Sequence, residues 1–202
     1  MIELENVDVY GWEATIRGMR NPMNSHERSD SIFDSKSTQI GSNDHDLMMR
    51  LASAGSVHAK YRRMITVTVD ITAPMYWWKE FDTYKVGTVR NSTSTMHKIA
   101  SMPFEMSHFS CDRMDNETKE AMQYITGRLE TLRLKFLETK DKQYWYNIIQ
   151  LLPSSYNQKA TVQLNYEVLV NIYHFRKNHK LDEWRNFCVW IESLPYSEII
   201  TA

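Results

Sequence analysis

The segment "WWKEFDTYKVGTVRNSTSTMHK", from Trp77 to Lys98, combines cations, carboxylates, a tyrosine and a run of small hydroxyl side chains. Its polar groups are too varied for a solvated helix face, and it lacks the alternation of a core strand. A phosphate group needs cations and fixed hydrogen-bond donors. Lys85 and Arg90 can supply positive charge. The hydroxyl donors are Ser92, Thr93, Ser94 and Thr95. The segment therefore predicts a site for the phosphate of a nucleotide, although Lys85 and Arg90 could equally be ordinary surface cations.

Two further cations lie in a later stretch, "LLPSSYNQKATVQLNYEVLVNIYHFRKN", which contains Lys159 and Arg176. Arg176 closes an apolar helical run, a position where an arginine usually has a partner. The base of a nucleotide would need a stacking face, for which Tyr84 and Tyr156 are candidates. Glu80 could face the site or pair with a neighbouring cation. We expect the two stretches to meet around a negatively charged small molecule.

The elements that would position the first stretch can be read from its surroundings. "RRMITVTVDITAP" alternates β-branched and polar residues and predicts a strand that Pro74 ends. "MYWWKEFDTYK" then predicts a helix that ends at Gly87. Trp77 and Trp78 are expected to pack in the core rather than bind a ligand. The predicted site thus lies where a helix turns into a loop.

The remaining periodicities predict a mixed architecture of several long helices and one sheet of antiparallel type. A strand over residues 1–10 and a helix over 12–20 precede a polar loop at about 21–43. The next helix would be capped by Asn43 or Asp44 and stopped by Gly55. Further helices are predicted at 115–139 and 142–152, from about Asn165 after an extended stretch, and at 180–194. The fold class is therefore α+β, in a single domain of residues 1–202.

Composition excludes several classes of protein. The net charge of the 202-residue chain is -1, so no basic excess predicts a nucleic-acid partner. No apolar run approaches the roughly 18 residues that span a bilayer, and the acidic start lacks a signal peptide, so we expect no membrane partner and a cytoplasmic location.

The two cysteines predict no disulfide framework: Cys188 is expected to pack in a helix, and acidic neighbours disfavour a Cys111 thiolate. The histidines lack metal-ligand spacing.

Two stretches together resemble the flavin-dependent thymidylate synthases, the ThyX family. In that family a strand ending in Ala-Pro, as in "APMYWWKEF", precedes a helix and the motif RHRxxSxNExSxR. Much later comes an "LP…Y…T…N…L…R" stretch, which "LLPSSYNQKATVQLNYEVLVNIYHFR" is similar to. The resemblance covers roughly residues 45–98 and 145–192, and it rests on order and spacing more than on identity. It implies a ThyX-like fold and an oligomer.

Laid without gaps on the family motif, Thr83, Tyr84 and Lys85 stand where the family has Arg-His-Arg. Thr88 and Thr93 match its two serines, Asn91 its glutamate, and Thr95 its last arginine. In the later stretch, Lys159 and Glu167 stand at arginine positions, whereas Asn165 keeps a flavin-contacting asparagine and Arg176 keeps an arginine on the nucleotide. His58 matches a histidine on the flavin side if one gap is allowed. Several hydroxyls survive, but the glutamate and three basic side chains do not.

The resemblance implies FAD as cofactor, dUMP or a related pyrimidine deoxynucleotide as substrate, methylenetetrahydrofolate as carbon donor, a reduced nicotinamide, and a homotetramer with sites between subunits. The substrate-binding candidates are Glu80, Tyr84, Lys85, Arg90, Ser92, Thr93, Ser94, Thr95, Lys159 and Arg176. The cofactor-binding candidates are His58, Lys60, Thr83, Thr88, Asn91 and Asn165. The alternative is a nucleotide-binding or assembly protein of the same fold that has lost flavin catalysis. The lost basic residues favour this alternative, while the retained polar character of residues 79–98 favours an enzyme.

Overall fold

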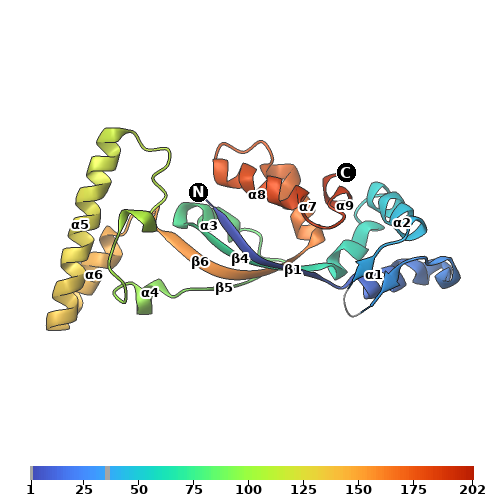
Figure 1. Ribbon diagram of the computed structural model, residues 1–202, viewed down its shortest axis with the longest axis horizontal. Coiled ribbons are helices and arrows are strands. Elements are labelled where there is room, and N and C mark those ends of the chain that lie inside the picture. Colours follow the sequence, from blue (N-terminus) through green and yellow to red (C-terminus); the bar gives the residue numbers. More distant parts are fainter. Residues whose placement is uncertain (1, 35–36) are drawn as a thin grey trace. The chain divides into compact units, whose positions relative to one another are not determined.

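The structure, a computed structural model, describes residues 2–34 and 37–202, and the chain divides into two compact units (Figure 1). The first unit comprises the chain up to Leu4, Asp70–Thr83 and Asn91–Thr161. The second comprises Glu5–Val69, Tyr84–Arg90 and Val162–Ala202.

Four strands form the main sheet, in the order β1-β4-β6-β5. They are β1 (Glu3–Tyr10), β4 (Thr66–Pro74), β6 (Asn157–Asn165) and β5 (Val89–Ser92). In β4, Val67, Val69 and Ile71 are fully buried while Thr68 and Asp70 between them are half-exposed. This alternation confirms the predicted strand. The sequence did not predict β5, because its four residues are mostly polar and exposed.

The first unit is built around two long helices, α5 (Asn116–Thr139) and α6 (Lys142–Leu151), which lie side by side (Figure 1). Asp115 caps α5 by accepting a hydrogen bond from the Thr118 N–H at 2.8 Å. The shared core contains Ile99, Phe104, Phe109, Met122, Leu129, Leu132 and Ile148. The unit also contains α3 (Met75–Phe81), α4 (Thr95–Lys98) and the short helix η4 (Met106–His108). Both tryptophans of α3 are buried, which confirms that they pack.

The second unit has α7 (Tyr166–Arg176) at its centre. α7 packs against α8 (Asp182–Glu192), α9 (Glu198–Thr201) and the 3-10 helix η3 (Ala59–Met64). The Asn165 side chain caps α7 by accepting from the Val168 N–H at 3.1 Å, so the predicted change from strand to helix at this residue is confirmed. α1 (Trp12–Arg20) joins this core through Trp12, whose ring lies edge-on to Tyr166. Cys188 is buried in α8, as predicted.

The polar stretch at about residues 21–43, predicted as a loop, contains regular structure, and its residues 35–36 lie outside the described residues. Two single-turn helices, η1 (Asn21–Met23) and η2 (His26–Arg28), come first. A two-stranded antiparallel hairpin of β2 (Ile32–Phe33) and β3 (Thr38–Gln39) follows. Strands of two residues are too short to produce a recognisable alternation in the sequence.

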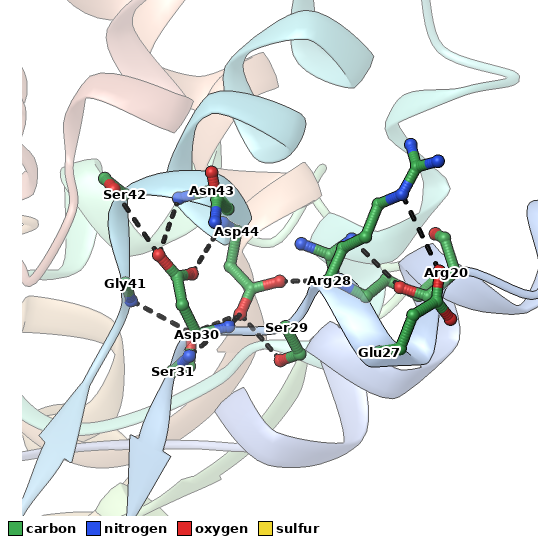
Figure 2. Close-up of polar contacts among 11 residues, drawn as sticks. Arg20, Glu27, Arg28, Ser29, Asp30, Ser31, Gly41, Ser42, Asn43 and Asp44 are labelled. Atoms are coloured by element: carbon green, nitrogen blue, oxygen red, sulfur yellow. Dashed lines mark hydrogen bonds and ion pairs between the residues drawn. The ribbon is translucent and has the colours of Figure 1, made fainter.

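The helix that follows, α2 (Ser42–Ser53), begins differently from the prediction. Gly41 is the N-cap residue, so the expected cap by Asn43 or Asp44 is wrong. The Asp30 side chain instead accepts from the N–H groups of Asn43 and Asp44, at 3.0 and 3.1 Å (Figure 2). The fully buried Asp44 carboxylate accepts from the Arg20 guanidinium at 2.6 Å and from the hydroxyls of Ser29 and Ser31. The ion pair with Arg20, 24 residues earlier in the chain, thus holds the Asp44 side chain in the core, where it cannot cap α2.

Gly87 does not end the helix that contains Trp77. α3 ends at Phe81, and Asp82 provides its C-cap. Gly87 has a positive φ of 77°, and an added Cβ would lie 2.9 Å from Asn165 Nδ2. Glycine is therefore needed there for a close approach between two parts of the second unit.

None of the helices in the described part of the chain is long and apolar enough to cross a membrane.

Candidate functional site

A pocket of about 290 Å³ in the first unit brings together four of the predicted substrate-binding residues. Thr93, Ser94 and Thr95 reach it from the turn after β5, and Lys159 reaches it from β6. The two segments are joined at this point by a backbone hydrogen bond of 2.9 Å from the Thr93 N–H to the Lys159 carbonyl. The pairing of β5 with β6 thus places hydroxyls and a cation from distant parts of the sequence beside one another.

Side chains hold the hydroxyl run in place. Gln158 Nε2 donates to the Thr93 carbonyl at 2.7 Å and lies 3.4 Å from Thr95 Oγ1. Ser94 Oγ accepts from the His97 N–H at 3.3 Å and caps the short helix α4. These contacts fix the backbone that carries the hydroxyls, which is what a preformed anion site requires.

Lys159 shares the pocket with a carboxylate. Its Nζ lies 3.8 Å from Asp70 Oδ2, and Asp70 Oδ1 accepts from the Thr161 hydroxyl at 2.6 Å. The lysine side chain is 47% exposed, so this ion pair is weak and the ammonium can turn toward a stronger anion.

Sequence reasoning missed several residues of this pocket. Lys98 and His108 line it, together with the buried Phe104. The signal for Lys98 was available, because it follows Ser94 by one helical turn in the same polar run. Tyr156, named as a stacking candidate, also lines the pocket, and burial raises the pKa of its phenol, which keeps it a neutral hydrogen-bonding group.

The other predicted residues of the first unit are Glu80, Thr83, Asn91 and Ser92, and none of them is among the described residues that line this pocket. Thr83 Oγ1 donates to the Glu80 carbonyl at 2.7 Å, so its hydroxyl satisfies a carbonyl at the C-terminal end of α3. Asn91 and Ser92 are exposed in β5. Their binding roles stay predictions.

In the second unit, Arg176 lies between two aromatic rings. Its Nε donates to the Tyr84 hydroxyl at 2.9 Å. Its guanidinium carbon lies 4.6 Å from the centre of the Trp184 ring and 5.6 Å from that of Tyr84. Trp184 is fully buried, so the arginine is held in a defined position against the core. Tyr84 therefore contacts Arg176, which the sequence placed in the same site.

The remaining candidates of the second unit differ in exposure. Thr88 is half-buried, and among the described residues its buried Oγ1 has no hydrogen-bond partner. Asn165 Nδ2 faces Gly87, as described above. The exposed candidates of this unit are His58, Lys60 and Lys85, and Arg90 is half-buried in β5.

Neither cysteine is suited to act as a nucleophile. Burial raises the pKa of the Cys111 thiol, and the neighbouring Asp112 adds to the effect. Burial raises the pKa of Cys188 to about 11, with a further contribution from Glu192. Both side chains are thus thiols near neutral pH, in agreement with the prediction for Cys111.

The fold is that of solved ThyX structures. It is similar to flavin-dependent thymidylate synthase ThyX from Helicobacter pylori complexed with FAD and dUMP, with a TM-score of 0.73 and 18% identity over 98% of this chain and 97% of that one. A second structure of the Helicobacter pylori enzyme, also with FAD and dUMP, gives a TM-score of 0.72 and 17% identity over 100% and 97% of the two chains. No family model and no curated protein matches the sequence. The predicted ThyX-like fold of helices and antiparallel sheet is thus confirmed, and identity this low shows the fold alone.

Proposed function

We propose that this protein is a flavin-dependent enzyme of thymidylate synthase type, which methylates dUMP or a related pyrimidine deoxynucleotide reductively. The observation that carries the proposal is the full-length likeness in fold to proteins solved with FAD and dUMP. The pocket that contains Thr93, Ser94, Thr95 and Lys159 supports it, because these residues supply the groups that a phosphate requires.

In this proposal the pocket of the first unit holds the nucleotide phosphate. The hydroxyls of the fixed Thr93–Thr95 run donate to the phosphate oxygens, and Lys159 exchanges its weak contact with Asp70 for the phosphate. Lys98 adds a second cation. Lysine lacks the two-pronged geometry of arginine, but it is a competent partner for phosphate.

The residues of the second unit fit a cofactor that brings its own hydrogen-bonding groups. A buried hydroxyl without a partner costs free energy, so the Thr88 Oγ1 favours a bound polar ligand. Thr88 and Asn165 would hold FAD together with His58 and Lys60, whereas Thr83 and Asn91 belong to the first unit and stay predictions from the family motif. When bound, FAD supplies the hydride, while the protein binds and orients the reactants.

The other elements of the proposal rest on the resemblance of the sequence to the ThyX family and, for the location, on its composition. Methylenetetrahydrofolate would supply the carbon and a reduced nicotinamide the electrons. The active form would be a homotetramer located in the cytoplasm.

A second candidate is a nucleotide-binding or assembly protein that does not use flavin. One specific observation favours it: His58 and Lys60, two of the cofactor candidates, are exposed. Thr83, Tyr84 and Lys85 also stand where the ThyX motif has Arg-His-Arg.

Two measurements separate the candidates. Protein purified after FAD addition and gel filtration is expected to keep the visible absorbance of oxidised flavin, and to bind dUMP in calorimetric titration. Colourless protein that binds dUMP would establish the second candidate instead. Protein that binds neither compound would contradict both.

A variant tests the sequence-based prediction that Arg176 contacts the nucleotide, although Arg176 does not line the pocket of the first unit. Arg176→Ala is expected to weaken dUMP binding by about 1.5–3 kcal/mol, as for a lost hydrogen bond to a charged group. Lys177→Ala is the control. Lys177 is the next residue and is also a cation, but it is exposed and its ammonium lies over the Tyr173 ring instead of contacting Tyr84 and Trp184. Equal dUMP affinity in the two variants would remove Arg176 from the site.

A further inference from the structure

A second concave surface lies in the second unit, formed by the end of α1, the segment of η1 and η2, and the side of α2. We call it the α2 groove. It has a volume of about 930 Å³ and is open to solvent. That volume lies in the range of pockets that take drug-sized ligands. None of the residues assigned above to the substrate or cofactor lines it.

Three arginines line the α2 groove: Arg20, Arg28 and Arg50. Arg20 is 4% exposed and is fixed by Asp44 at 2.6 Å and by the Ser25 carbonyl at 3.2 Å (Figure 2). Its charge is thus compensated by Asp44, and it supports the wall of the groove rather than offering a free cation.

The other two arginines are weakly engaged. Arg28 Nε lies 3.6 Å from Glu27 Oε1, and both side chains are at least 70% exposed, so this pair contributes little. Arg50 makes no ion pair within the described part of the chain, and its Nε lies 3.4 Å from the Asp46 carbonyl. Arginine matches phosphate oxygens with two parallel donors, so the exposed Arg28 and Arg50 on one groove favour a ligand with more than one phosphate group.

The remaining lining adds two features. Glu27 and Asp46 place two carboxylates in the groove. Mg²⁺ is typically bound by one or two carboxylates together with ligand phosphates, so they fit a polyphosphate that arrives with its metal ion. Met23, Leu47 and Met49 supply an apolar wall, and Asn43 supplies an amide. Met23 is 82% exposed, so it is available to cover a flat apolar ring.

From this combination we propose that the α2 groove binds a nucleoside polyphosphate as its magnesium complex. Arg28 and Arg50 hold the phosphates, the carboxylates face the metal ion, and the methionines with Asn43 cover the base. The site is separate from the pocket proposed for dUMP, and it does not depend on flavin chemistry. Its ligand would therefore act as an effector rather than as a substrate.

Calorimetric titration of the whole protein with dTTP and Mg²⁺ tests the proposal. The variant with Arg28→Ala and Arg50→Ala should bind roughly 100-fold more weakly, as for two lost charge-assisted contacts. Both side chains are exposed, so the variant should fold. Arg17→Ala is the matched control, since Arg17 is exposed on α1, is paired with Glu13 and does not line the groove. It should bind like the unmodified protein.

Three outcomes would overturn the proposal: no binding of dTTP by the unmodified protein at millimolar concentration, equal affinity in the double variant and the Arg17 control, or complete displacement of dTTP by dUMP. Inorganic triphosphate with Mg²⁺ tests the nucleoside part, because it should bind at least about tenfold more weakly if the apolar wall contacts a base. Equal affinity of the two ligands would refute that part. FAD uptake by the double variant should equal that of the unmodified protein, so failure of flavin binding leaves this test intact.

Discussion

Replacing Asp44 with asparagine should lower the free energy of unfolding by about 3 kcal/mol. Asp44 is fully buried and accepts five hydrogen bonds, three from side chains and two from the backbone N–H groups of Asp30 and Ser31 (Figure 2). It joins α1, the hairpin segment and α2. Asparagine keeps one acceptor oxygen, but it removes the charge that compensates Arg20.

The size of the expected loss in unfolding free energy follows from the state of Arg20 in the variant. Arg20 is 4% exposed, so the variant would leave a buried guanidinium without its carboxylate. Removing one partner of a buried ion pair typically costs about 3–5 kcal/mol, and the remaining amide oxygen places this variant at the lower end. For a chain of this length, that loss corresponds to a melting temperature lower by about 6–12 °C.

The effect should depend on pH in a defined direction. Burial opposes ionisation of Asp44, but hydrogen bonds from Ser31, Ser29 and Arg20 outweigh it and lower the pKa of the carboxyl. A lowered pKa in the folded state contributes stability above the pKa of the unfolded chain. That contribution disappears as the pH falls through the folded-state pKa. The difference between the two proteins should therefore be largest near neutral pH and shrink in acid.

Urea unfolding followed by circular dichroism would measure the difference. Glu13→Gln is the control, because Glu13 forms an exposed ion pair with Arg17 on the same helix as Arg20. Such a pair contributes at most about 0.5 kcal/mol. A loss below about 1 kcal/mol for Asp44→Asn at neutral pH, or one that grows in acid, would refute the reasoning.

Two further predictions concern the second unit. Tyr84→Phe removes the hydroxyl that accepts from Arg176 but keeps the ring beneath it, so unfolding free energy should fall by only about 1 kcal/mol in denaturant titration. A loss above about 3 kcal/mol would mean that the hydroxyl has another essential role. In thiol titration at pH 8, Cys111 should react with an aromatic disulfide before unfolding and Cys188 only after it, because burial raises the pKa of Cys188 to about 11. Equal rates for the two thiols would contradict the packing of α8.

The sequence predicted those parts of the fold in which local pattern and tertiary packing agree. The alternation in β4, the long apolar stripe of α5 and the change from strand to helix at Asn165 are local signals, and the structure has all three. β5 was missed because backbone pairing with β6, rather than apolar alternation, makes it a strand. The cap at Asp44 was wrong because a distant arginine competes for its carboxylate.

For the candidate site, the sequence identified residues suited to binding an anion, but it did not predict which of them lie together in the structure. The hydroxyl run and Lys159 do share one pocket, because adjacent strands bring them together. Lys85 and Arg176 belong to the other unit, a division that no spacing along the chain reveals. Trp184 was read only as part of an amphipathic helix, although its ring supports Arg176. Such a contact depends on the angle between α7 and α8, which local periodicity does not encode.

The indole of Trp145 gives the pocket of the first unit an internal optical reporter. Its Nε1 donates to the Met96 carbonyl at 3.2 Å, one residue beyond the pocket-lining Thr95, and its ring is only half-buried. Trp12, Trp77 and Trp184 are sealed in the core, and the half-buried Trp190 lies in α8 of the other unit. Buried Trp78 donates its Nε1–H to the carbonyl of the pocket-lining Gln158 at 2.9 Å. The fluorescence change on ligand entry would then come chiefly from Trp145 and Trp78, and entry could be timed by stopped flow without attaching a dye.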